Sequence, residues 1–90
     1  MKIVYNDAVG GFMWPDVIYE KFKLTARFGD DLKDRTNESI IACLEQLDKE
    51  EIGHLCICEI PDEATDWMVV QDDGFETVYY VLDGKIRNAT

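Results

Sequence analysis

Apolar and polar residues alternate in several stretches of the chain, and a period of two is typical of strands with one buried face. The chain opens with such a stretch from Ile3 to Asn6, and Asp7 ends it. Three more follow in the second half, at residues 54–60, 67–71 and 75–82, and Lys85-Ile86 predicts a short fifth strand. Asp-Gly pairs follow the last two long strands, and this pair supplies the positive φ of a two-residue hairpin turn. The second half of the chain therefore predicts an antiparallel meander.

Two segments after the first strand show helical spacing instead. Trp14-Pro15-Asp16 begins the first helix, because proline and an early aspartate both favour a first helical turn, and Gly29 can end it. Thr36 or Asn37 caps the second helix, and Gly53 can end it. The second helix has one apolar face, formed by Ile40, Ile41, Leu44 and Leu47. The polar residues 29–36 between the helices predict a loop.

The order strand–helix–helix–strand–strand–strand, with the short fifth strand last, indicates an α+β fold. We expect an antiparallel β-sheet of four to five strands packed on two helices. Ninety residues with 47% hydrophobic side chains are enough for a single folded domain over residues 1–90. No apolar run is long enough to span a bilayer, and the start of the chain becomes polar too soon for a signal peptide. We therefore expect the protein in the cytoplasm.

The charge of the chain is strongly acidic and unevenly distributed. Nine basic and nineteen acidic residues give a net charge of −10. Residues 1–53 hold seven basic and eleven acidic side chains, whereas residues 54–90 hold two and eight. Such a chain repels nucleic acid and anionic membranes and is attracted to basic surfaces. We therefore expect a basic protein as the partner, with no direct nucleic acid and no membrane.

The residues with catalytic or metal-binding chemistry are few. His54, Cys56 and Cys58 share one strand face, but successive side chains on it lie roughly 7 Å apart. Zinc usually takes cysteine pairs from loops or turns, and no second pair is present, so apolar packing of the thiols is the favoured interpretation. No nucleophile lies beside a base, so we predict no catalytic residue, no enzyme, no metal and no cofactor.

The loop Gly10-Gly11-Phe12 is an alternative ligand site. Backbone amides before a helix bind anions, so this loop invites a nucleotide-binding interpretation. Neither G-x-G-x-x-G nor G-K-[ST] is present, and acidic residues surround the loop, so a turn is the favoured interpretation.

Acidic and aromatic residues coincide in the second half of the chain. Tyr79 and Tyr80 are neighbours on one strand and must point to opposite faces. Exposed aromatics beside acids are typical of a protein-binding patch, although the aromatics alone are equally consistent with a small core. The predicted interface consists of Asp62, Glu63, Asp66, Asp72, Asp73, Glu76, Tyr79 and Tyr80.

Several short pieces of the sequence, taken in order, resemble one group of proteins. They are MKIVYND with GGF at the start, DRT at residues 34–36, CEIPDE at residues 58–63 and DDGFETV at residues 72–78. Together they are similar to an uncharacterised family of short proteins from tailed phages and prophages. The segment GGFMWPDV departs from that family because it lacks a Ser-Asp cap. The resemblance implies a phage setting and no particular reaction.

These observations leave three hypotheses. The first is a small phage-type accessory protein that binds a basic host or phage protein in the host cytoplasm. An anti-defence or host-takeover inhibitor that mimics nucleic acid is one form of it. The second is a nucleotide-binding protein that uses the Gly10-Gly11 loop. The third is a structural component that self-associates, as a homodimer, through an exposed edge strand between Leu82 and Ile86.

Overall fold

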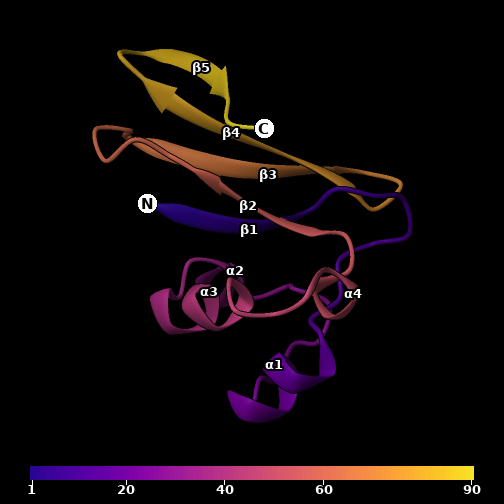
Figure 1. Cartoon of the computed structure of the whole chain (residues 1–90). Coiled ribbons are helices and arrows are strands. Elements are labelled where there is room, and N and C mark those ends of the chain that lie inside the picture. Colours follow the sequence, from indigo (N-terminus) through magenta and orange to yellow (C-terminus); the bar gives the residue numbers. More distant parts are fainter.

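The fold combines helices in the first half of the chain with strands at its start and in its second half (Figure 1). The computed structural model describes residues 1–90 and confirms the α+β class. Its strands are β1 (Lys2–Asn6), β2 (Leu55–Glu59), β3 (Asp66–Asp72), β4 (Phe75–Leu82) and β5 (Lys85–Asn88). Its helices are α1 (Asp16–Lys21), α2 (Leu32–Arg35), α3 (Glu38–Leu44) and α4 (Lys49–Ile52).

The strands form two antiparallel sheets rather than one meander. β1 pairs with β2, with Val4 opposite Ile57, and β3, β4 and β5 form the second sheet in that order. The single four- to five-stranded sheet predicted from sequence is wrong in this respect. Both faces of the β1–β2 ribbon are apolar, so it can be covered on both sides. Val4 packs with the helices on one side, whereas Ile3 packs with β4 on the other.

The helical half contains four short helices where the sequence predicted two. α1 ends at Lys21, well before Gly29, and Pro15 occupies its N-cap. The polar segment predicted as a loop contains α2, whose first turn is capped because Lys33 N donates to the Asp31 side chain. The Asn37 carboxamide caps α3, as predicted. α4 is a separate helix because Asp48 adopts an extended backbone between the two.

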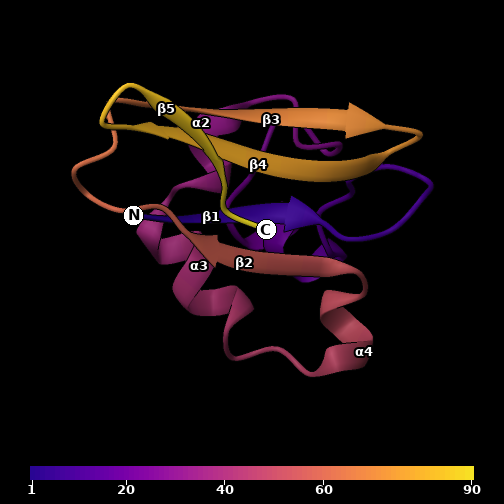
Figure 2. The ribbon, with the colours of Figure 1, turned by 90° about the horizontal axis from the view of Figure 1, so that it is seen from above.

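The second sheet is a true meander with the predicted turns. Asp73-Gly74 and Asp83-Gly84 each have positive φ at both positions, which matches the twist of the strands they join. The first half of β4 lies beside the free edge of β1, and its second half pairs with β5 (Figure 2). β4 is therefore the strand that joins the two sheets.

The core has two parts, one on each side of the β1–β2 ribbon. The larger part lies between the ribbon and the helices and is centred on Trp14, Ile18 and Leu44. The smaller part joins Ile3, Ile60 and Val78 beneath the second sheet. No helix has the length and apolar character that crossing a membrane requires.

Candidate functional site

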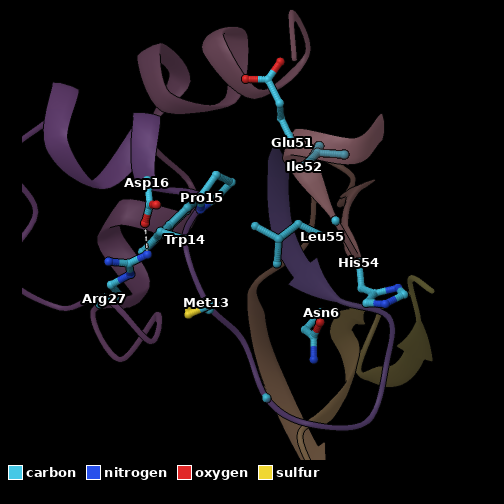
Figure 3. A pocket seen from close by; sticks show the side chains of 12 residues that line it. Asn6, Met13, Trp14, Pro15, Asp16, Arg27, Glu51, Ile52, His54 and Leu55 are labelled. Carbon is cyan, nitrogen blue, oxygen red and sulfur yellow. Dashed lines mark hydrogen bonds and ion pairs between the residues drawn. The ribbon is translucent and has the colours of Figure 1, made fainter. Parts of the chain in front are cut away.

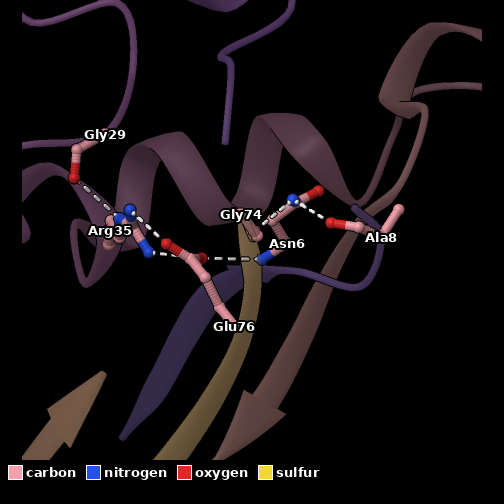
Figure 4. A network of polar contacts seen from close by, with 6 residues as sticks. All are labelled: Asn6, Ala8, Gly29, Arg35, Gly74 and Glu76. Atoms are coloured by element: carbon pink, nitrogen blue, oxygen red, sulfur yellow. Dashed lines mark hydrogen bonds and ion pairs between the residues drawn. The ribbon is translucent and has the colours of Figure 1, made fainter. Parts of the chain in front are cut away.

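A buried ion pair connects the helical half to the second sheet (Figure 4). Arg35, in the single turn of α2, donates from Nη1 and Nη2 to the two carboxylate oxygens of Glu76 at 2.7 and 2.9 Å. Its Nε donates to the carbonyl oxygen of Gly29 at 2.9 Å, and its guanidinium lies over the Phe12 ring. All three nitrogens of the guanidinium thus donate hydrogen bonds inside the protein, and one of its faces is covered by an aromatic ring.

The Glu76 carboxylate also replaces a missing backbone contact between the two sheets. Asn6 N, at the end of β1, donates to Glu76 Oε1 at 2.9 Å. The Asn6 side chain donates to the carbonyl oxygens of Ala8 and Gly74 at 2.7 and 2.8 Å. Since both charged side chains are almost fully buried, at 4% exposure for Arg35 and 2% for Glu76, this network holds the fold together and offers no binding surface.

Glu76 was predicted to belong to an exposed interface, and its burial corrects that prediction. Its side chain alternates with those of Phe75 and Thr77 and therefore shares the inner face of β4 with Val78. A carboxylate on a buried face must be paired, and Arg35 supplies the pairing.

The Gly10-Gly11-Phe12 loop packs against the first hairpin turn. Gly10 N donates to the carbonyl oxygen of Asp73 at 3.0 Å, so this amide is occupied. A Cβ added to Gly74 would lie 2.1 Å from Gly11 N, which shows how closely the two backbones approach. Phe12 is buried against Arg35 and Trp14. The loop has the geometry of a packed turn, and no observation favours a nucleotide there.

A cavity of about 330 Å³ lies between the loop before α1 and the turn before β2 (Figure 3). Asp16 and Arg27 form an ion pair at its wall, and His54 also lines it. Two donors of lining residues, Trp14 Nε1 and Arg27 Nε, have no hydrogen-bond partner. Both atoms are fully shielded by protein, so neither is available to a molecule in the cavity.

The cysteines of β2 line the face of the ribbon that points away from the helices. Cys58 lies opposite Ile3, and Cys56 lies opposite Tyr5. Burial raises the pKa of the Cys58 thiol to about 11, and burial followed by the nearby Cys56 raises the pKa of Tyr5 to about 12. These groups stay protonated near neutral pH, and no three His, Cys, Asp or Glu side chains are arranged to hold a metal ion.

The second sheet exposes an apolar surface on the side away from the core. We call it the outer face. The side chains of one strand alternate between faces, and directly paired residues share a face. The pairs Met68–Tyr79, Val70–Thr77 and Val81–Ile86 therefore lie together, with Asp72–Phe75 at one end and Asp66–Val81 at the other. Four large apolar side chains on this face are between 38 and 68% exposed: Met68, Val70, Phe75 and Ile86.

The charges on the outer face are all acidic. Asp66 and Asp72 lie at its two ends. The only cations of the sheet, Lys85 and Arg87, pair with Leu82 and Tyr80 and so belong to the opposite face. Exposed apolar side chains from three strands, with one aspartate at each end, have the composition of a protein-binding surface.

The structure brings only part of the predicted interface together. Asp66, Asp72 and Tyr79 share the outer face. Tyr80 lies on the inner face, where it packs with the smaller core. The remaining acids lie elsewhere: Asp73 in the hairpin turn, Asp62 and Glu63 in the exposed turn before β3. Asp62 accepts a hydrogen bond from the Met1 amine at 3.1 Å and lines a cleft with Glu59 and Lys2.

Sequence reasoning missed the apolar members of the outer face. Met68, Val70 and Ile86 were assigned to strands but not to an exposed surface. Their side chains alternate along the strands with those of inner-face residues such as Val69 and Val78. Because both faces of β3 and β4 contain apolar residues, this alternation alone does not show which face is exposed.

Comparisons with known proteins identified no relative of this chain. No family model matches the chain, and neither a curated protein nor a solved structure matches it. The resemblance to short phage proteins therefore stays a prediction.

Proposed function

We propose that this protein acts by binding a second protein with a basic surface, through the outer face of β3, β4 and β5. The observation that carries the proposal is the exposed apolar patch of Met68, Val70, Phe75 and Ile86, which has no cation among its charged neighbours. Methionine and aromatic residues are enriched in protein interfaces, and an exposed apolar patch flanked by polar residues is typical of an interaction site.

The acidic residues determine which kind of partner is favoured. Asp66 and Asp72 at the ends of the face, with a net charge of −10 on the whole chain, attract a basic protein and repel an acidic one. This is a binding role rather than a catalytic one. If the phage resemblance holds, the partner is a basic host or phage protein in the host cytoplasm, and inhibition of a host function is the natural consequence.

Nucleic-acid mimicry is the less favoured form of this proposal. Exposed carboxylates occur on α3 and α4 as well as on the second sheet, for example at Glu38 and Glu51. Mimicry needs a row of acids in place of a row of phosphates, whereas the outer face combines apolar side chains with acids at its ends. That combination supports ordinary docking on a partner that is both basic and apolar.

The proposal is tested by affinity capture with two matched variants. Val70→Lys and Gln71→Lys each add one positive charge to β3 at exposed neighbouring positions, but only Val70 lies on the outer face. Capture from a bacterial lysate at low salt should yield a basic protein. We expect Val70→Lys to weaken its binding more than tenfold, or ~1.4 kcal/mol, and Gln71→Lys to weaken it less than about threefold.

Two results would overturn the proposal. One is the absence of any specifically retained protein at low salt. The other is equal retention by wild type and Val70→Lys, since binding elsewhere on the molecule would be insensitive to this substitution. Both variants should keep the thermal stability of the wild type, which a melting experiment checks, because both side chains are exposed.

A further inference from the structure

The free edge of β3 indicates how the proposed interface recognises its partner. Resting on the proposed function, we infer that the partner contributes an extended basic segment, which adds to this edge as a further antiparallel strand. β3 is hydrogen-bonded to β4 alone and lies at the outside of the strands (Figure 2). An edge strand of this kind is a template for pairing with another chain.

The register of the hairpin decides which backbone groups of β3 face the edge. In a two-residue turn such as Asp73-Gly74, the flanking residues Asp72 and Phe75 exchange hydrogen bonds, and every second pair along the ladder does the same. Asp72, Val70 and Met68 therefore direct their amides to β4. Trp67, Val69 and Gln71 direct theirs outward.

One contact in the structure agrees with this register. Trp67 N donates to the Asp66 side chain at 2.9 Å, so this amide is not part of the β3–β4 ladder. It is also already occupied. The amides of Val69 and Gln71 are the outward groups that remain for an added strand.

The aspartates at the two ends of β3 determine which kind of strand can pair with its free edge. A strand added to β3 would place alternate side chains beside Asp66, Met68, Val70 and Asp72 on the outer face, so cations at its two ends and apolar residues between them fit best. A second copy of this chain fits poorly. In a symmetric antiparallel pairing of two β3 strands centred on Val69, Asp66 of each copy would lie opposite Asp72 of the other, and like charges directly opposite each other destabilise a sheet.

This alternation defines a probe. A seven-residue peptide, blocked at both ends, with the sequence lysine-threonine-valine-threonine-valine-threonine-lysine places both lysines and both valines on one face. It reads the same in either direction, so either strand orientation is matched. A control peptide carries glutamate in place of both lysines. Two further peptides are methylated on one backbone nitrogen, either of the central threonine, which would face β3, or of a neighbouring valine, which would face solvent.

The experiment titrates each peptide into the full chain and measures amide hydrogen exchange and chemical shifts by NMR. At saturation with the lysine peptide, we expect exchange at Val69 and Gln71 to slow more than about tenfold, with little change at Asp83. Valine methylation should change the affinity less than about threefold. Methylation of the central threonine, and the glutamate ends, should each weaken binding more than about tenfold.

The other outcomes overturn the inference and leave the proposed function separately testable. Shifts at Met68 and Val70 without slower exchange at Val69 and Gln71 would mean that the partner covers the face and does not extend the sheet. Equal binding of the two methylated peptides would mean the same. Slow exchange at both amides without peptide, together with dimers in sedimentation, would identify a second copy as the occupant. Absence of binding by every peptide would reject strand addition, while affinity capture still tests the face.

Discussion

The substitution Glu76→Gln isolates the energetic role of the buried network. Glu76 Oε1 accepts from Arg35 Nη1 and Asn6 N, and Oε2 accepts from Arg35 Nη2. Glutamine keeps the shape of the side chain but has one oxygen, so an amide NH₂ would face a donor at one of these contacts. It also leaves the guanidinium of Arg35, 4% exposed, without a counter-charge.

The expected loss of stability is large for a chain of this size. Removing one partner of a buried ion pair costs about 3–5 kcal/mol. A 90-residue domain has a total unfolding free energy of about 5–13 kcal/mol, and 1 kcal/mol shifts its Tm by about 4–8 °C. Glu76→Gln should therefore lower the Tm by ~12 °C or more, and a marginally stable protein would unfold at room temperature.

Urea unfolding followed by circular dichroism measures this loss. Glu63→Gln is the matched control, because it makes the same chemical change in an exposed turn and should alter stability by less than about 0.5 kcal/mol. The double variant Arg35→Met with Glu76→Gln removes both charges and should be more stable than Glu76→Gln alone. If Glu76→Gln lowers the unfolding free energy by less than about 1 kcal/mol, and the urea m-value is unchanged, the buried network contributes little to the stability of the fold.

Two further predictions concern packing and pH. Gly74→Ala should lower the Tm much more than Gly84→Ala. Both glycines follow aspartate in a turn and have positive φ, but only at Gly74 would the new Cβ collide with Gly11. Equal melting shifts for the two variants would contradict this. Burial raises the pKa of Cys58 to about 11 and of Tyr5 to about 12, above their ordinary values of 9.0 and 10.0. As the pH rises, the unfolded chain therefore loses these protons before the folded chain does. The unfolding free energy that is fully present below pH 9 should fall as the pH rises through 11 and 12. Unfolding at graded pH checks this fall, and Cys58→Ala should reduce the part between pH 9 and 11.

The sequence predicted the strands and hairpin turns better than it predicted the helices or the sheet order. Alternation and the two Asp-Gly pairs are local signals, and they located β4 at its observed bounds. The helix α2 has no apolar face, and its inward side chain is Arg35, so hydrophobic periodicity cannot detect it. The division into two sheets depends on which strand edge β4 approaches, and the contacts made there, such as Asn6 N with the Glu76 carboxylate, join residues far apart in sequence.

The candidate site was predicted only in outline, for a related reason. The acidic ends of the outer face, Asp66 and Asp72, were identified because charge can be located directly in a sequence. Tyr79 and Tyr80 were correctly placed on opposite faces, but which face lies outward depends on the covering of the inner one by Ile3 and Ile60. Tertiary packing of this kind leaves no signal in a single strand.

The sequence predicts a resemblance to phage proteins from four short pieces, and three of them, all except CEIPDE, meet at one place in the folded chain. The GGF piece supplies Phe12 beneath the guanidinium, the DRT piece supplies Arg35, and the DDGFETV piece supplies Glu76 together with Gly74. All three therefore specify the junction between helices and sheet, whereas the outer face depends on residues outside them or on their solvent side, such as Met68 and Val70. Proteins that share those pieces would share this junction and hence the fold, but their outer faces would be free to differ. The partner of each such protein must therefore be inferred mainly from its outer face and its β3 edge, because DDGFETV is the one of these three pieces that reaches the outer face, through Asp72 and Phe75.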